Sequence, residues 1–417
     1  MIVRRTAAVL AATAAIAAAG APAALADDKS PSAAPSQAIP SGLYGSADPT
    51  YDGVWRQSLA LLAQHTVGEK PAAKAVDWLT GQQCASGAFA AYRADASAKC
   101  DAKTMVDTNS TAAAVQALEA LGGHDSETGA AVKWLKSVQN KDGGWGYTPG
   151  GASDANSTAV VIGALAAGGT DPKSVPSKDD KTPYDALLTF SLPCEENGGG
   201  SFAFQPDKKG KLAANADATA AAVTGALGKG FAGADVKPAG APACKSGDNL
   251  DAEQAAQNGA AYLTTALAKD KYLKSALAGA TMDAPDYGNT ADAVVALSTA
   301  GRGDKAADAL RWLEKNSGAW AAKAGPAAYA QLIFAAEANG ADPRDFGGAD
   351  LVKQLNATGP ATQVSDSAAP SAKSTSDEKK KDDDGSGVGV WWIVGVGLVA
   401  GIGVGFLFSG RNKKQQL

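Results

Sequence analysis

One phrase of the sequence recurs, and this repeat limits the fold more than any other feature does. It combines Asp, Asn and Thr-Ala over six residues and always precedes a run rich in Ala, Val and Leu; its copies stand at residues 107–112, 154–159 and 286–291, with a looser copy at 215–220. A second phrase, ending in Trp-Leu, alternates with the first, at residues 75–79, 131–135 and 309–313. Regular internal repetition of this kind predicts one structural unit used several times.

Each phrase predicts a helix. In the first, Asp or Asn stands ready as an N-cap, and a glycine follows each apolar run, as at helix C-termini. In the second, Trp-Leu follows apolar residues three and four positions earlier, which gives an amphipathic stripe. Twelve helices follow from this pattern, near residues 52–65, 72–83, 107–121, 127–139, 154–167, 180–193, 215–228, 252–268, 289–300, 303–316, 326–339 and 347–355.

Twelve helices in six pairs can close into two concentric rings. The Ala-rich helices, apolar on all sides, are expected in the inner ring, and the helices with Trp, Lys and Glu in the outer ring. An open helical solenoid is the alternative arrangement. The chain is rich in Ala and only 6% aromatic, which also favours close helix packing over a β-sandwich.

The two ends of the chain predict where the protein is located in the cell. Residues 1–26 combine two arginines, an apolar run and an Ala-Leu-Ala cleavage site, which is typical of a secretory signal peptide. Residues 388–408 carry no charge and are long enough to cross a bilayer, and basic residues follow in the tail at 409–417. We therefore expect a single-pass type I protein of the cell membrane with an extracellular ectodomain.

Low-complexity segments separate these parts. They predict a flexible leader at 27–46 and a disordered stalk at 356–387, with the toroidal ectodomain between them at 47–355. Gly397, Gly401 and Gly405 lie on one face of the membrane helix and could pair two copies. A net charge of −5 argues against nucleic acid as a partner.

The segment Gln-Asn-Lys-Asp-Gly-Gly-Trp-Gly at residues 139–146 stands after a Trp-Leu helix and before an Asp-x-Asn-x-Thr-Ala helix. It resembles the prenyltransferase/squalene-cyclase repeat. The resemblance implies an all-α, α6/α6 toroid, to which the predicted C-terminal transmembrane helix is added. It is strongest over residues 75–169 and weakens toward residue 343.

The branches of this family differ in chemistry. Class II terpene cyclases, which look similar, protonate an alkene with the third residue of their Asp-rich motif. That position is Asn109 and Asn156 in two copies, and an amide delivers no proton. Asp217 holds it in the loose copy but lacks flanking carboxylates in its own motif, so it is a weak candidate for a catalytic acid. The family's protein prenyltransferases hold zinc, but His65 and His124 offer no zinc triad, and we expect no metal.

Secreted cobalamin carriers of the intrinsic factor and transcobalamin type also resemble this chain. Export, disulfides and the missing catalytic residues favour this branch, although the small β-domain of the carriers is absent. The main hypothesis is therefore a membrane-tethered, non-catalytic protein that binds a small ligand, such as a corrinoid, at the barrel mouth and requires no cofactor. The alternative is a terpene cyclase-like or prenyltransferase-like enzyme acting on isoprenoids. A third hypothesis is an interaction module that docks a membrane transporter or second subunit.

Loops from outer to inner helices would all emerge at one mouth, where polar caps and aromatic side chains converge into a candidate ligand site. The expected ligand-binding residues are Asp107, Asn109, Asp154, Asn156, Asn215, Asp217, Asp286, Asn289, Trp145, Tyr147, Phe202, Phe204, Tyr287 and Tyr92, with Trp320 from the same loops. Each Asp or Asn can also be an ordinary N-cap, and each aromatic residue can plug a turn.

Four cysteines in an exported chain predict two disulfides with three possible connectivities. The short spacing favours Cys84–Cys100, which leaves Cys194 and Cys244 for the second bond. Cys194 is expected at the mouth and Cys244 at the opposite end, so residues 229–251 would have to climb the barrel wall to bring the two together.

Overall fold

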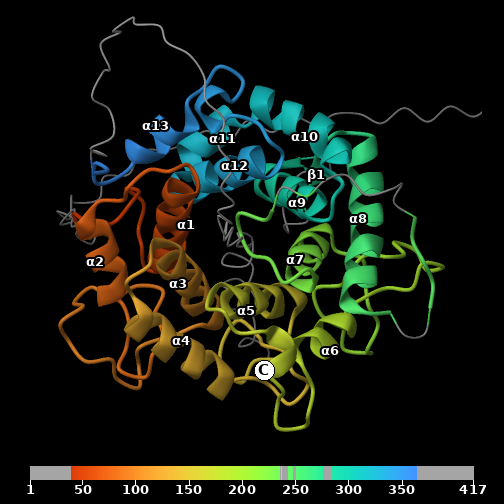
Figure 1. Cartoon of the computed structure of the whole chain (residues 1–417), viewed down its shortest axis with the longest axis horizontal. Coiled ribbons are helices and arrows are strands. Elements are labelled where there is room, and N and C mark those ends of the chain that lie inside the picture. Colours follow the sequence, from red (N-terminus) through yellow and green to blue (C-terminus); the bar gives the residue numbers. More distant parts are fainter. Residues whose placement is uncertain (1–38, 235, 237–242, 248–249, 276–283, 364–417) are drawn as a thin grey trace, which may run out of the picture. The chain divides into compact units, whose positions relative to one another are not determined.

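The computed structural model describes residues 39–234, 236, 243–247, 250–275 and 284–363. Within these residues six helices form an inner ring (Figure 1), namely α1 (Gly53–Thr66), α3 (Thr108–Leu121), α5 (Ala155–Ala167), α7 (Ala216–Ala226), α9 (Tyr287–Thr299) and α12 (Pro326–Ala338). Each packs on the next, and α12 packs on α1, so the ring is closed. The predicted closed ring is therefore confirmed, and the open solenoid is excluded.

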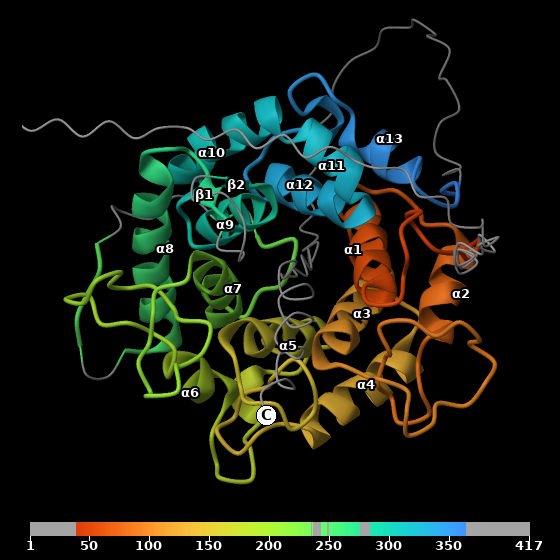
Figure 2. The ribbon, with the colours of Figure 1, turned by 180° about the vertical axis from the view of Figure 1, so that it is seen from behind.

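The outer helices cover the inner ring one by one (Figure 2). They are α2 (Ala73–Gly81), α4 (Asp125–Ser137), α6 (Pro183–Leu188), α8 (Ala252–Ala268), α10 (Gly303–Asn316) and α13 (Leu351–Asn356). Shorter elements complete the described chain: α11 (Gly318–Ala324), the 3₁₀ turns η1 (Pro172–Ser174) and η2 (Pro343–Asp345), and an antiparallel pair of β1 (Leu273–Lys274) and β2 (Pro285–Asp286), in which Leu273 pairs with Asp286.

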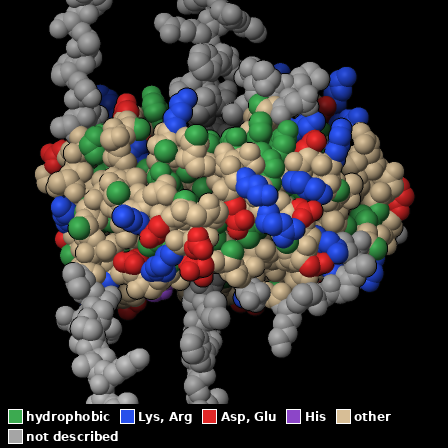
Figure 3. All heavy atoms as spheres, turned by 90° about the horizontal axis from the view of Figure 1, so that it is seen from above, with side chains coloured by type: hydrophobic (Ala, Val, Ile, Leu, Met, Phe, Trp, Pro, Cys, Tyr) green, Lys and Arg blue, Asp and Glu red, His purple; other side chains and the backbone are tan. Residues whose placement is uncertain are grey.

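The two rings differ in burial as predicted. In α5 every residue from Ala155 to Leu165 is buried, because this helix is covered on all sides. In α10 only Ala306, Ala309, Leu310 and Leu313 are buried, which is a single stripe at helical spacing. Basic and acidic side chains lie interspersed on the outer face seen in Figure 3. The alternation of all-apolar and amphipathic helices in the sequence therefore places each helix in its ring.

Two predicted helices differ from the structure, and one further helix was not predicted. The helix expected at 180–193 is only α6, because Thr182 and Asp185 cap each other at its start. The helix expected at 347–355 starts later, since Gly347 and Gly348 have positive φ and Asp350 forms the cap. Helix α11 was not expected and continues almost directly from α10.

The folded domain extends beyond both predicted linker boundaries. Tyr44, placed in the leader, is fully buried; its hydroxyl donates to the Pro360 carbonyl at 2.8 Å and accepts from Gln64 Nε2 at 2.9 Å. The Gly45 N–H donates to the Thr358 carbonyl at 2.9 Å. Residues 39–46 and 356–363 are therefore part of the fold, because they satisfy each other's polar groups where the ring closes.

The predicted signal peptide, membrane span, cytoplasmic tail and the Gly397, Gly401 and Gly405 face lie outside the described residues, as does the stalk beyond residue 363. Among the helices that the structure does describe, none combines the length and the apolar character needed to span a bilayer.

Both disulfides form. Cys84 pairs with Cys100 and Cys194 with Cys244, with Cα–Cα distances of 5.6 and 5.8 Å, which are ordinary for this bond. Residues 229–234, the start of the connection that was expected to climb the barrel wall, contact inner helices, and residues 235 and 237–242 of that connection lie outside the described residues. Glycines allow this path, since Gly163 and Gly230 approach each other without a side chain between them.

Candidate functional site

The repeated phrase forms the first turn of four inner helices. Its first residue is the N-cap in every copy: one side-chain oxygen accepts from the backbone N–H three residues later, at 2.6 Å for Asp107 and Asp154, 2.9 Å for Asn215 and 3.0 Å for Asp286. These four predicted site residues therefore hold the helices in place.

The fifth residue of the phrase ties each inner helix to the loop before it. The Oγ1 atoms of Thr111, Thr158, Thr219 and Thr290 accept from the backbone N–H of Phe89, Trp145, Phe202 and Leu273, at distances between 2.9 and 3.1 Å. The bond repeats in four copies, which explains why Thr recurs at this position. Sequence reasoning had not assigned a role to it.

Two aromatic residues expected at the rim are buried under these loops. Trp145 is 1% exposed and donates its indole N–H to the Leu135 carbonyl at 2.8 Å, and Phe202 is fully buried. The expectation that they face a ligand is therefore wrong, because they fill the turns that the threonines hold. Phe204 is half-buried against the core, and its carbonyl accepts from the Ala155 N–H.

Tyr287 and Trp320 also lie in a packed group. The Tyr287 ring stacks on Trp320 at 5.5 Å and on Trp312 of α10 at 5.2 Å between centroids. This stack fixes the start of α9 against the outer layer.

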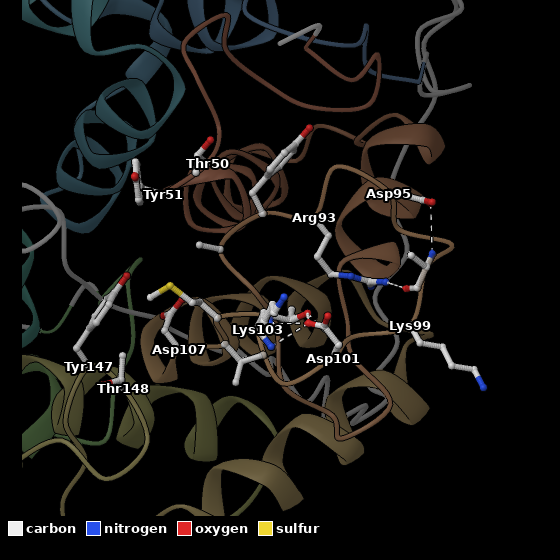
Figure 4. Close-up of a pocket in the computed structure, with 16 residues that line it drawn as sticks. Thr50, Tyr51, Arg93, Asp95, Lys99, Asp101, Lys103, Asp107, Tyr147 and Thr148 are labelled. Carbon is white, nitrogen blue, oxygen red and sulfur yellow. Dashed lines mark hydrogen bonds between the residues drawn. The ribbon is translucent and has the colours of Figure 1, made fainter. Parts of the chain in front are cut away.

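A pocket of about 480 Å³ opens beside the start of α3 (Figure 4). Three predicted residues, Tyr92, Asp107 and Tyr147, line it together with Tyr51 and Met105. The loop that forms its far side is clipped by Cys84–Cys100 and held by the Arg93 guanidinium, which donates to the Gly81 carbonyl at 2.9 Å. This part of the predicted mouth is a real cavity, and the remaining predicted residues do not line it.

The third residue of the phrase distinguishes the copies. Asn156 of α5 donates from Nδ2 to Asp217 Oδ2 of the neighbouring α7 at 2.9 Å. Asp217 Oδ1, Asn109 Oδ1 and Asn156 Oδ1 are buried and have no hydrogen-bond partner among the described residues. In the fourth copy the third residue is Gly288, and Asn289 Oδ1 is the buried acceptor without a partner. One end of the inner ring therefore holds unused hydrogen-bonding capacity.

Asp217 is the carboxyl group in this set that is best suited to proton transfer. Burial raises its pKa to about 7; the bond from Asn156 acts in the opposite direction, and the charges of Asp286 and Asp154 raise the pKa further. Asp217 has no flanking carboxylates in its own motif, but the caps of the neighbouring helices, Asp154 and Asp286, supply them. Near neutral pH a large fraction of this group carries a proton.

Asp292 is a second buried carboxyl group that sequence reasoning missed. It is 3% exposed in α9, and Gln331 Nε2 of α12 lies 3.1 and 3.0 Å from its two oxygens. Burial, followed by the charge of Asp217, raises its pKa well above the usual range. The available signal was a lone acid inside the Ala-Asp-Ala-Val-Val run of an otherwise apolar helix.

The capping carboxyls share this environment. Burial raises the pKa of Asp107 and of Asp154 to about 6 in each case, against the hydrogen bonds that lower it. Within the described residues no salt bridge reaches Asp107, Asp154, Asp217 or Asp292, and no cluster of three or more His, Cys, Asp and Glu side chains could hold a metal ion. The described geometry thus offers proton-bearing acids.

Comparisons with known proteins bear on this geometry. Residues 54–224 match the family model of the prenyltransferase alpha-alpha toroid domain. Drimenyl diphosphate synthase from Streptantibioticus cattleyicolor is 38% identical over 80 residues, which are 19% of this chain and 13% of that protein. The chain thus matches only a small part of the length of this curated relative.

Solved structures are more distant. The ent-copalyl diphosphate synthase from Streptomyces platensis is 15% identical with a TM-score of 0.46, and the match covers 69% of this chain and 50% of that one. A protein from Actinoplanes is 13% identical with a TM-score of 0.47, with coverage of 73% and 95%.

The main hypothesis of a non-catalytic ligand carrier is wrong. A curated relative that shares 38% identity over 80 residues is a diphosphate synthase, and the reported comparisons do not support the resemblance to cobalamin carriers. The closed double ring and the match over residues 54–224 together support the prenyltransferase alpha-alpha toroid family for this chain.

Proposed function

We propose that this protein is an isoprenoid-processing enzyme of the terpene cyclase type, in which Asp217 protonates an alkene of the substrate. The similarity to drimenyl diphosphate synthase supports an isoprenoid substrate. The observation that carries the proposal is the buried Asp217 carboxyl, with Asn156 bound to one oxygen and, in the part of the chain that the structure describes, no partner on the other.

The two oxygens of Asp217 have different roles in this proposal. Oδ2 accepts from Asn156 Nδ2, so Oδ1 carries the proton. The alkene π electrons form a C–H bond as the Oδ1–H bond breaks, which leaves a carboxylate on Asp217 and a cation on the substrate. Asn156 stabilises that carboxylate through its existing bond. Loss of a proton from the cation to water and reprotonation of Asp217 from water complete the cycle.

The pKa of about 7 suits this role. An acid works best when its pKa lies near the working pH, because it is then both protonated and able to give its proton away. Alkene protonation consumes only a proton, so we propose that the step requires no resident cofactor.

The test uses the purified full-length chain with squalene and with prenyl diphosphates, with products separated by mass. Asp217→Asn keeps the side-chain shape and its bond to Asn156 but carries no acidic proton, so we expect turnover to fall at least ~100-fold. The matched control is Asp251→Asn at the N-cap of the outer helix α8, where either residue type caps well. Product that survives Asp217→Asn rules out this acid.

We propose further that the enzyme works at the outer face of a membrane, on the basis of the predicted signal peptide at 1–26 and span at 388–408. A membrane-embedded or membrane-bound isoprenoid would then reach the toroid without leaving the bilayer surface. Protease accessibility of the toroid in intact cells tests this location, and a toroid protected from external protease contradicts it.

A further inference from the structure

The pocket beside the start of α3 (Figure 4) has no part in the proposed function, because Asp217 does not line it. Its volume of about 480 Å³ is within the range of small-molecule sites in proteins, ~300–1,000 Å³. Among the described residues the exposed large apolar side chains are Tyr51, Met105, Tyr147 and Val236, and all of these except Val236 line this pocket. Apolar side chains that gather around one hollow of the surface mark it as a ligand site.

Asp107 is the buried acid of this pocket. It is 4% exposed, and its Oδ1 accepts from the Ser110 N–H at 2.6 Å, a bond within its own helix. The equivalent cap of α5, Asp154, is held at both oxygens, because the Ser157 hydroxyl also donates to Oδ2 at 2.8 Å. The Ser110 hydroxyl lowers the pKa of Asp107 but makes no such bond to Oδ2 among the described residues. This oxygen is therefore left for a ligand.

Three basic side chains also line the pocket, and within the described residues none of them forms a salt bridge with Asp107. The Arg93 guanidinium is bound to backbone carbonyls of its own loop, such as that of Gly81 at 2.9 Å. Figure 4 shows Arg93 and Lys99 directed away from Asp107. Lys103 is the basis of the competing assignment, an anionic ligand, which the experiment below has to separate from a cationic one.

The aromatic side chains line the pocket together with this acid. Burial, followed by the charge of Asp107, raises the pKa of Tyr147, so the two side chains are close to each other. Tyr51 and Tyr92 belong to the same lining, and the Tyr92 ring is supported by Trp78, which stacks on it at 6.4 Å between centroids. A carboxylate without an ion-pair partner among tyrosine rings is suited to an organic cation, which gains from the negative charge and from the ring faces.

We propose that this pocket binds an organic ammonium ion, with the charged nitrogen at Asp107 and the apolar substituents against Tyr51, Met105 and Tyr147. The site is additional to the proposed catalytic acid, so its occupancy can be measured without any isoprenoid turnover.

The pH separates Asp107 from the other acids of the pocket. Burial, against the hydrogen bonds of its own helix, raises the pKa of Asp107 to about 6. Hydrogen bonds, chiefly from the Ser97 hydroxyl and the Lys103 N–H, lower the pKa of Asp95 and of Asp101. Asp107 is therefore the carboxyl of the pocket lining that changes its charge near pH 6. Affinity for a cation is full well above this pH and is lost as the pH falls through about 6.

The test titrates the purified full-length chain with benzylamine, whose ammonium group stays charged over the whole range, and follows binding by ligand-observed NMR. We expect the dissociation constant to rise about tenfold from pH 7.5 to pH 5, because only about one tenth of Asp107 is ionised at pH 5. Benzyl alcohol and phenylacetate are the neutral and anionic probes, and each should bind at least ~10-fold more weakly than benzylamine at pH 7.5. Tighter binding of phenylacetate assigns the pocket to an anion and overturns the proposal.

Asp107→Asn removes the charge and keeps an N-cap, since Asn and Asp cap helices about equally well. We expect the affinity for benzylamine to fall about tenfold or more at pH 7.5, and its pH dependence to disappear. The matched control is Asp154→Asn, the same change at the equivalent cap outside the pocket lining, which should leave the affinity unchanged. An equal loss in both variants, or no loss in Asp107→Asn, overturns the site.

Tyr51→Ala tests the aromatic wall without disturbing the core, because Tyr51 is 64% exposed. We expect the affinity for benzylamine to fall about two- to fivefold, and Tyr51→Phe to retain it, because the ring face rather than the hydroxyl contacts the cation. No loss in Tyr51→Ala, or an equal loss in Tyr51→Phe, overturns the role of this ring. A wild-type chain that binds no benzylamine overturns the whole proposal, whereas the proposed isoprenoid chemistry is decided separately by Asp217→Asn.

Discussion

The first turns of α5 and α7 are built on the same phrase and differ at one decisive side chain. In both, the first residue caps the helix and the fifth residue, Thr158 or Thr219, holds the preceding loop. The third residue is Asn156 in one and Asp217 in the other, and the two side chains bind each other. The comparison teaches that the repeat keeps the fold through its first and fifth positions, whereas the residue at its third position varies between copies.

The largest effect is expected when the residues at the third position of the two phrases, Asn156 and Asp217, are exchanged. The double variant Asn156→Asp/Asp217→Asn keeps one amide and one acid in contact but moves the acid to α5. We expect turnover of isoprenoid to fall at least ~100-fold, because the proton then starts from the wrong atom. Activity close to wild type would show that the side of the pair that carries the acid does not matter.

The fifth position should matter equally in both helices. Replacing Thr158 or Thr219 with Val removes the acceptor for a buried backbone N–H, so we expect each variant to lose ~1–3 kcal/mol of unfolding free energy in denaturant titrations. Thr→Ser at the same site keeps the oxygen and should recover most of the loss. A loss confined to one of the two helices would contradict the shared structural role.

The pH dependence of the unfolding free energy tests the protonation of the third residue of α7, Asp217. The pKa of Asp217 is about 7 in the folded protein, whereas the ordinary pKa of an Asp side chain, which applies to the unfolded chain, is 3.8. Between these two pH values the folded state therefore binds more protons than the unfolded state. Stability contributed by this proton is therefore full below pH 3.8 and is lost as the pH rises through about 7.

We expect Asp217→Asn to flatten this dependence, by roughly 2–3 kcal/mol between pH 5 and pH 7.5. The measurement is urea unfolding at a series of pH values. The carboxyls of Asp107 and Asp154, with pKa values of about 6, act in the same direction and leave a residual slope. An unchanged slope in the variant would show that Asp217 is not protonated in the folded protein.

The smallest effect is expected at the first position. Asp154→Ala and Asn215→Ala each remove an N-cap, which costs ~1 kcal/mol in unfolding free energy. The two losses should be similar if the first position only caps. A much larger loss in Asp154→Ala than in Asn215→Ala would assign Asp154 a second structural role.

Much of this arrangement could be predicted from the sequence, because it depends on local signals. Caps such as Asp107 and glycines after the apolar runs mark the ends of the inner helices, and the alternation of helix types predicts two rings. The pairing of Cys84 with Cys100 also follows from proximity along the chain.

The rest depends on contacts between distant residues. Asn156 and Asp217 are 61 positions apart, and nothing near either residue in the sequence shows that they meet. Phe231 follows α7, yet its partners belong to the first and the last inner helices. The loss of Trp145 and Phe202 from the expected rim has the same cause, since an aromatic residue in a Gly-rich loop can face inward or outward until the loop is packed.

The closure of the ring also has a consequence for how the protein is made. Helix α1 packs on α12, and Tyr44 and Gln64 find their partners in Pro360 and Asn356. In a chain emerging from the ribosome, the side of α1 that will pack on α12 therefore has no partner until almost the whole toroid has been translated. Such late, long-range pairing slows folding and leaves apolar surface open to chaperones in the meantime.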